Sequence, residues 1–280
     1  MLAHSKRVFS EKRFIFQRFF KVVGADMPAE RLTKQIALDY LQAQARKRSG
    51  HAANKERKNL VAAWNWGAEY MDLPTLNPFK VRKFPEEKHP RYMPPLEDFW
   101  AVYQQADRAD QVFLLTFLYT AARRGEVFSL TWEDVDFARN RVRLFTRKRA
   151  GGNREGDWVE MVQELRESLL WWWENRPHKD SPYVFTVHGG HTFENQHEGE
   201  QFRSRQHFLR KLCEKAGVKP FGFHAIRHLT ASILDMAGKE LTLIQGVLRH
   251  QNPYTTARYL HSLRGVRAEL EDSLPKPPAR

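Results

Sequence analysis

A proline-rich segment at residues 83–95 divides this chain of 280 residues. The segment holds four prolines among alternating charged residues, and proline both fixes its own φ and lacks an N–H for helix or sheet bonding. This composition favours an extended connector on the surface. We therefore expect one domain at residues 1–84, a linker at 85–95, a second domain at 96–272 and a tail at 273–280. One continuous helical domain is the alternative, and the proline density argues against it.

The spacing of apolar residues predicts the secondary structure on each side of the linker. Before the linker, apolar residues repeat at the spacing of amphipathic helices in two stretches, at residues 32–41 and 60–71. After the linker, the pattern predicts two helices, then two strands joined by a turn, then a leucine-containing helix, a loop and further helices. The two helices are predicted at residues 96–107 and 111–122, and the two strands at 141–145 and 158–161, with the turn at 150–153. The leucine-containing helix is predicted at 165–170 and the loop at 186–200, and the remaining residues are predicted to be helical. The predicted fold class is mainly α with a small antiparallel β-sheet (α+β).

Positive charge is concentrated in the first third of the chain. The formal net charge is +13, and residues 1–90 carry 18 Lys and Arg against 9 Asp and Glu, a net charge of +9. The remaining residues carry 28 against 24, a net charge of +4. A basic face can be only a solvated surface, but this excess suits a module that binds the phosphate backbone of a nucleic acid.

Other features of the sequence indicate where in the cell the protein is located. Cys213 is the single cysteine, so an internal disulfide is excluded. The longest apolar run, residues 112–122, is too short to span a bilayer, and the first residues lack the apolar core of a signal peptide. We expect a cytoplasmic protein with no membrane partner.

Groups suited to phosphodiester cleavage occur in order near the end of the sequence. His224 and Arg227 are three residues apart, so a helix places an imidazole and a guanidinium on one face. His250 lies nine residues before Tyr259. A base, a planar cation, a second imidazole and a phenol are what a protein needs to attack a phosphodiester with tyrosine. Each residue alone says little, but the ordered set is hard to produce by chance.

This set resembles the tyrosine recombinase (phage integrase) family, and three blocks carry the resemblance. Residues 120–126 (TAARRGE), leading into 130–136, look like the first-arginine block of the family. Residues 224–227 look like its H-x-x-R box, and residues 248–259 like its L-G-H block with the nucleophilic tyrosine. The resemblance covers residues 95–265. One departure is Arg249, which stands in the local turn where the family usually has glycine.

The resemblance implies a catalytic role for several residues. Arg123 and Arg227 would clamp the scissile phosphate with paired guanidinium donors. Tyr259 would attack the phosphorus as the nucleophile. His224 would help to take the tyrosine proton, and His250 would hydrogen-bond the phosphate.

A lysine on a β-hairpin completes the implied set. Lys148 follows the predicted strand at 141–145, and it would protonate the leaving 5′-oxygen. Its neighbours Arg147 and Arg149 would make its ammonium a better acid. The alternative is that residues 147–149 form only a basic hairpin tip on DNA, and both interpretations can hold together.

Two neighbours compete with the assigned arginine and tyrosine. Arg124 adjoins Arg123, and on a helix the two would point about 100° apart, so the resemblance selects Arg123. Tyr254 lies too close to His250 to match the family pattern. Glu126, three residues after Arg123, is expected to orient the site.

Histidines offer only a weak case for a metal. His228 forms an i,i+4 pair with His224, but zinc hydrolases place a glutamate beside the first histidine and this chain has alanine. His188, His191 and His197 are irregularly spaced in a predicted loop. We therefore predict no metal site.

The resemblance implies a site-specific DNA recombinase or integrase that cleaves and rejoins double-stranded DNA through a 3′-phosphotyrosine intermediate. It implies a phage or another mobile element as the source, a helical SAM-like core-binding domain before the catalytic domain, a homotetramer on two recombination sites, and room for accessory DNA-bending proteins. It also implies a reaction that requires no metal, nucleotide or other cofactor. The alternatives are a tyrosine-type DNA topoisomerase and a sequence-specific DNA-binding protein that does not cut.

Overall fold

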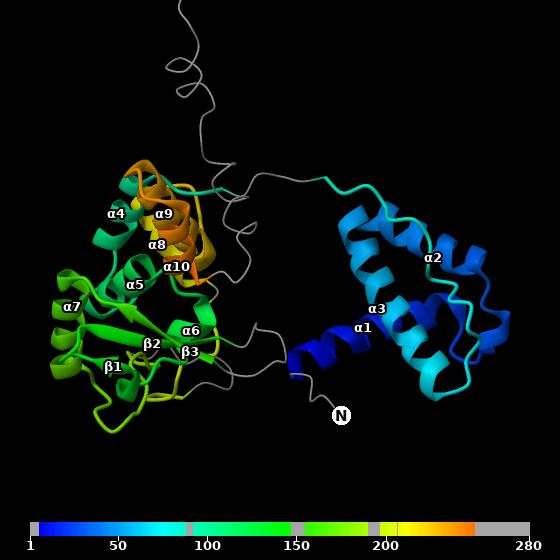
Figure 1. Ribbon diagram of the computed structural model, residues 1–280, viewed down its shortest axis with the longest axis horizontal. Helices are drawn as coiled ribbons and strands as arrows, with labels where there is room; N and C mark the ends of the chain where they lie inside the picture. The colour runs from blue at the N-terminus through cyan, green and yellow to red at the C-terminus, as the bar shows by residue number, and fades with distance from the viewer. Residues whose placement is uncertain (1–5, 88–91, 147–154, 190–196, 206, 250–280) are drawn as a thin grey trace, which may run out of the picture. The chain divides into compact units, whose positions relative to one another are not determined.

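The computed structural model describes residues 6–87, 92–146, 155–189, 197–205 and 207–249, and it divides the chain into two compact units (Figure 1). The units comprise Met1–His89 and Pro90–Arg280. Across the described residues the fold is mostly helical with one small antiparallel sheet, which confirms the predicted fold class. No described helix has both the length and the apolar character needed to cross a membrane.

The described part of the first unit is built from helices. These are α1 (Lys6–Val23), the single turn η1 (Ala29–Arg31), α2 (Lys34–Lys47) and α3 (Gly50–Tyr70). Side chains cap two of the helices, because the Thr33 and Ser49 hydroxyls accept hydrogen bonds from the backbone N–H groups of Ile36 and Ala52. An apolar core that includes Phe19, Leu41 and Leu60 lies between the helices.

A buried carboxylate also ties these helices together. Glu56 on α3 is 1% exposed, and it accepts hydrogen bonds from Arg18 on α1, from Arg48 just after α2 and from the Tyr40 hydroxyl on α2. Burial, together with the bond to Glu56, raises the pKa of Tyr40 above its ordinary value. The charge of Glu56 is therefore matched by partners from its neighbouring segments.

The residues before the unit boundary lie against α3. The Asn54 side chain both accepts from the Phe84 N–H and donates to its carbonyl, at 2.9 Å each, and Arg57 Nε donates to the Val81 carbonyl at 2.7 Å. A Cβ on Gly50 would lie 1.8 Å from the Pro85 carbonyl oxygen, so the close approach of the two segments requires glycine. The start of the proline-rich segment is thus packed on the first unit.

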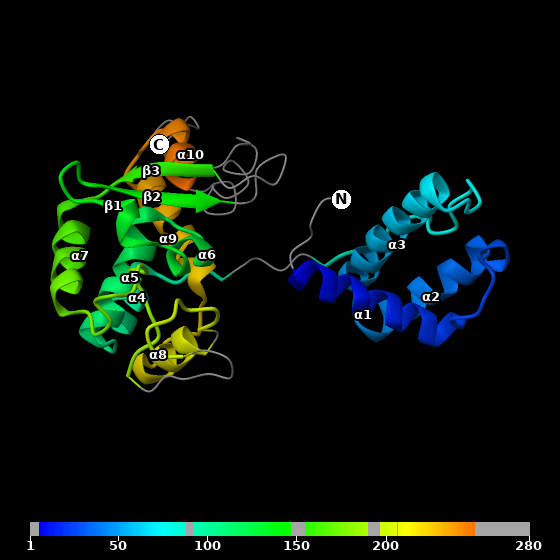
Figure 2. The same ribbon diagram turned by 90° about the horizontal axis from the view of Figure 1, so that it is seen from below.

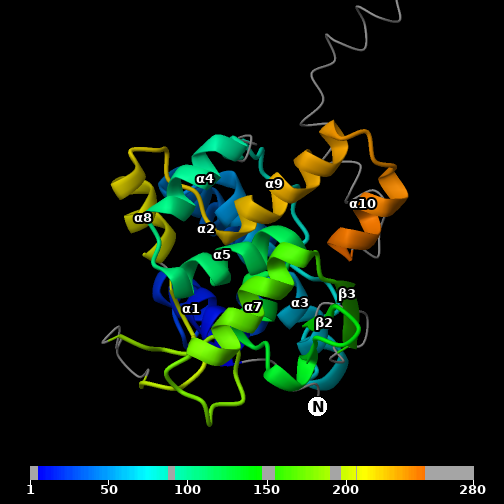
Figure 3. The same cartoon turned by 90° about the vertical axis from the view of Figure 1, so that its left-hand side faces the viewer.

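Helix α5 (Arg108–Thr120) forms the centre of the second unit (Figure 3). It contacts α4 (Leu96–Gln104), α6 (Arg124–Phe128), α7 (Gln163–Asn175) and α9 (Phe223–Met236). Because it is covered on several faces, nearly every residue from Val112 to Thr120 is buried. The remaining described helices are α8 (Phe208–Ala216), α10 (Leu241–Leu248), which packs on α9, and the short turn η2 (Trp132–Asp134).

A three-stranded antiparallel sheet lies in the described part of the second unit (Figure 2). Its order is β1 (Val135–Asp136), β2 (Arg141–Thr146) and β3 (Glu155–Glu160). Burial alternates along β2, as expected for a strand with one face on a core. Strand β3 begins three residues before the predicted start at 158, because Glu155 pairs with Thr146 although residues 155–157 carry no apolar side chain.

Candidate active site

The first-arginine block forms the turn between α5 and α6. Ala121 ends α5 in the left-handed conformation, with φ 48°, and Arg123 is extended (φ −77°, ψ 150°) at the N-cap of α6. The expectation that Arg123 and Arg124 share a helix is therefore wrong. Arg124 is the first residue of α6 and its side chain is exposed, with the guanidinium 5.9 Å from the Phe128 ring centre.

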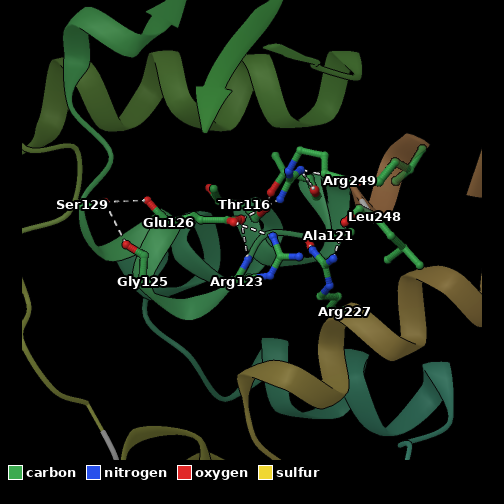
Figure 4. Close-up of polar contacts among 11 residues, drawn as sticks. Thr116, Ala121, Arg123, Gly125, Glu126, Ser129, Arg227, Leu248 and Arg249 are labelled. Atoms are coloured by element: carbon green, nitrogen blue, oxygen red, sulfur yellow. Dashed lines mark hydrogen bonds and ion pairs between the residues drawn. The ribbon is translucent and has the colours of Figure 1, made fainter. Parts of the chain in front are cut away.

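Glu126 orients Arg123, as the sequence suggests. Its Oε1 accepts from Arg123 Nη1 at 2.8 Å, and its Oε2 accepts from the Arg123 backbone N–H at 2.8 Å. The same Oε2 accepts from Arg249 Nη2 at 2.6 Å (Figure 4). One buried carboxylate, 4% exposed, thus holds both the backbone and the side chain of Arg123.

The charge on Glu126 is stabilised by these partners. Burial alone would raise the pKa of its carboxyl group. The Arg249 guanidinium and the hydrogen bonds from Arg123 outweigh that effect, and the pKa of Glu126 lies below its ordinary value of 4.5. Glu126 is therefore ionised at neutral pH and available as an acceptor.

Arg227 on α9 contacts the same turn. It is 1% exposed, and its Nη1 donates to the Ala121 carbonyl while its Nη2 donates to the Leu248 carbonyl (Figure 4). Arg227 thereby links α9 to the end of α5 and to the end of α10. Because Ala121 lies two residues before Arg123, the structure brings the two predicted clamp arginines to one turn.

His224 lies in the first turn of α9, one turn before Arg227. It is exposed, and its ring packs edge-on against that of His228, with centres 4.7 Å apart. His188, from the loop region, has its Nδ1 2.8 Å from the Thr186 carbonyl oxygen. Within the described ranges, no three His, Cys, Asp or Glu side chains cluster in a way that could hold a metal ion.

Comparison with known proteins identifies the family. The family model described as Phage integrase family matches residues 95–265. The chain belongs to the phage integrase family. A "Tyrosine recombinase XerC-like" protein of Caldanaerobacter subterraneus is 27% identical over an alignment of 186 positions, which covers 55% of this chain and 46% of that protein. The match therefore spans about half the length of this relative.

Solved structures of integrases share the fold. The Tn1549 transposon integrase in complex with a circular intermediate DNA aligns with 98% of this chain and 95% of its own, at 16% identity and a TM-score of 0.74. A lambda integrase tetramer bound to a Holliday junction aligns with 92% of this chain and 72% of its own, at 15% identity and a TM-score of 0.69.

Three predicted site residues of this family member lie outside the described residues, namely Lys148, His250 and Tyr259. The described residues end close to two of them in the sequence, Lys148 and His250. Strand β2 ends at Thr146 and β3 begins at Glu155, so Lys148 belongs to their connection. Helix α10 ends at Leu248, and His250 follows one residue after the cap Arg249. Their catalytic roles remain predictions, and Tyr254, the turn at 150–153 and His191 also lie outside the described residues.

Arg249 is the site residue that the sequence does not assign. It appears there only as a departure from the family pattern, whereas its side chain is 5% exposed and ion-paired with Glu126. Burial lowers the pKa of Arg249, and Glu126 opposes that shift. An arginine directly after a buried helix end, close to a family motif, is the signal that could have indicated an internal partner.

Proposed function

We propose that this protein is a site-specific DNA recombinase that cleaves and rejoins double-stranded DNA through a 3′-phosphotyrosine intermediate. The observation that carries the proposal is the placement of Arg123 and Arg227 at one turn, with Glu126 holding Arg123 and Ala121 contacted by Arg227. Guanidiniums fixed in this way suit the nonbridging oxygens of a phosphodiester, where negative charge concentrates in the transition state.

In the proposed reaction, the phenol oxygen of Tyr259 attacks the phosphorus and the bond to the 5′-oxygen breaks. The products are a 3′-phosphotyrosine and a free 5′-hydroxyl. His224 helps to take the phenol proton, Lys148 gives a proton to the leaving 5′-oxygen, and His250 hydrogen-bonds the phosphate. Attack by the 5′-hydroxyl of a partner strand reverses these steps and releases Tyr259. One phosphodiester is exchanged for another, so the reaction balances without a metal ion or a nucleotide.

The two units suggest a division of labour. We propose residues 1–84 as a helical, SAM-like core-binding domain, 85–95 as the linker, 96–272 as the catalytic domain and 273–280 as a tail. The net charge of +9 over residues 1–90 supports binding of the first unit to the DNA backbone, and such binding weakens with added salt. The Tn1549 integrase is in complex with a circular intermediate DNA, and the lambda integrase tetramer is bound to a Holliday junction.

The assembly and the source follow as proposals from the same neighbours. The lambda integrase neighbour is a tetramer on a Holliday junction, and we propose a homotetramer on two recombination sites for this chain, with accessory DNA-bending proteins as additional partners. A transposon integrase and a lambda integrase among the neighbours support a phage or another mobile element as the source. We propose a cytoplasmic location, where the DNA of such an element is accessible.

Capture of covalently attached DNA tests the proposal and identifies the target site. Tagged protein is expressed with a plasmid library of genomic fragments from its source, purified under denaturing conditions, and the attached DNA is sequenced. The proposal predicts recovery of one short recurrent site with wild-type protein and none with Tyr259→Phe. Tyr254→Phe is the matched control and should behave like the wild type.

The outcome also separates the alternatives. Recombination between two copies of the recovered site supports a recombinase. Relaxation of any supercoiled plasmid, without site preference or recombination, would indicate a topoisomerase. Binding of DNA without covalent attachment by any variant would indicate a DNA-binding protein that does not cut.

A further inference from the structure

Arg249 ends α10 in a conformation that favours glycine. Its φ is 49° and its ψ is 47°, in the left-handed region, where a side chain crowds the backbone and glycine is favoured. An arginine here needs a compensating interaction, and its side chain provides one.

The Arg249 side chain folds back into the protein. It is 5% exposed, and its Nη2 lies 2.6 Å from Glu126 Oε2 (Figure 4). Its Nη1 lies 3.1 Å from the Thr120 carbonyl oxygen. Thr120 is the last residue of α5, and Glu126 lies within α6. One guanidinium therefore joins the end of α10 to both helices that flank the first-arginine turn.

The charged groups with the largest effects on this contact are Arg123 and Asp157. Glu126 faces both Arg249 and Arg123. The negative charge of Asp157 on β3 favours the charged form of Arg249, whereas the positive charge of Arg123 disfavours that form. Arg123 and Arg249 bind the same carboxylate, mainly through different oxygens. Arg249 and Arg123 are thus linked through Glu126, so we expect a change at Arg249 to alter the position and charge of Glu126 and, through it, the position of Arg123.

We propose that Arg249 is a positioning residue for strand cleavage, a latch that couples the segment carrying His250 and Tyr259 to the phosphate-binding Arg123 through Glu126. This inference rests on the proposed function. Arg249 does not contact the phosphate in this account. It sets the geometry between the nucleophile's segment and the clamp, where a small displacement has a large effect on rate.

The test compares Arg249→Gly, Arg249→Lys, Glu126→Gln and the double variant Arg249→Gly/Glu126→Gln. Glycine suits the left-handed turn, so Arg249→Gly removes the latch without straining the backbone. The readout is the single-turnover rate of covalent adduct formation on a nicked substrate that carries the recovered site, between pH 5 and 9, beside the DNA-binding affinity. Arg249→Gly should slow cleavage by roughly 10- to 100-fold and leave DNA affinity unchanged. Arg249→Lys keeps the charge and should restore part of the rate.

The pH profile separates positioning from a general loss of structure. Without Arg249, only the bonds from Arg123 oppose the effect of burial, so the pKa of Glu126 should be higher than in the wild type. Cleavage by Arg249→Gly should therefore fall more steeply than wild-type cleavage as the pH decreases. Glu126→Gln cannot titrate and should show no such acid loss. Because both residues act through one contact, the double variant should be no slower than the slower single variant.

Three results would overturn the latch. They are wild-type cleavage by Arg249→Gly, a pH profile of Arg249→Gly that is parallel to the wild type, and multiplying effects in the double variant. A wild-type protein that forms no adduct on the nicked substrate would instead refute the proposed function. The two failures are therefore distinguishable in one set of reactions.

Discussion

Replacing Arg227 by alanine should destabilise the protein as well as stop cleavage. Arg227 donates to the carbonyls of Ala121 and Leu248, and both of these residues are 0% exposed. Each buried carbonyl that loses its partner costs about 1–3 kcal/mol, so the two together cost about 2–6 kcal/mol. Such a loss is a large part of the stability of an ordinary domain.

Arg123→Ala is the matched control for this prediction. The Arg123 side chain is 22% exposed and its ion pair is with Glu126, which still accepts from the Arg123 backbone and from Arg249. The variant leaves one buried acceptor, Glu126 Oε1, without this donor, against two buried carbonyls in Arg227→Ala, so loss of the Arg123 side chain should cost about 1–3 kcal/mol, roughly half as much. Urea unfolding followed by tryptophan fluorescence measures both variants, since six of the eight tryptophans lie in the second unit. Equal destabilisation of the two variants, or none in Arg227→Ala, would refute the reasoning.

Three further predictions address charge, packing and chemistry. Since the pKa of Glu126 is below 4.5, its ion pairs stabilise the fold fully above that pH, and this stability is lost as the pH falls through the folded pKa. Glu126→Gln should therefore show a smaller decline in the free energy of unfolding between pH 7 and 3, measured by urea titration. An unchanged decline would count against the pairing. Gly50→Ala should release the segment at Pro85 and accelerate proteolysis there, because the added Cβ would lie 1.8 Å from the Pro85 carbonyl oxygen. Gly246→Ala is the control and should leave proteolysis unchanged, because a Cβ there meets nothing within 4 Å. Lys148→Ala should slow cleavage of ordinary DNA by ~10²–10⁴-fold. On a 5′-bridging phosphorothiolate substrate, whose thiolate leaves without a proton, the variant should recover most of the wild-type cleavage rate. Equal slowing on both substrates would assign Lys148 to positioning.

Local signals in the sequence predicted most of the fold. The continuous apolar run at residues 112–122 indicated a buried helix, and α5 is covered by helices on several sides. Gly217 and Gly238 follow the ends of α8 and α9 with φ of 69° and 67°, the left-handed conformation in which glycine commonly ends a helix. These features depend on neighbouring residues along the chain, so a single sequence contains the information that specifies them.

Long-range contacts explain what the sequence did not predict. Glu126 and Arg249 are 123 positions apart, and only the packing of α10 beside the α5–α6 turn brings them together. The start of β3 at Glu155 is set by pairing with β2, not by its own side chains. The placement of Arg123 before α6, and not on it, follows from the left-handed residue Ala121, which no glycine signals.

Mapping the residue that carries the DNA tests the central claim most directly. Trypsin cuts after Arg249, Arg258 and Arg264, so Tyr254 and Tyr259 fall on different peptides, residues 250–258 and 259–264. Wild-type adduct on the recovered site is digested with nuclease and trypsin, and the peptide that retains a nucleotide is sequenced by mass spectrometry. The account predicts a nucleotide on Tyr259, in a peptide that includes residues 259–264. A nucleotide on Tyr254 or on any other residue would contradict it.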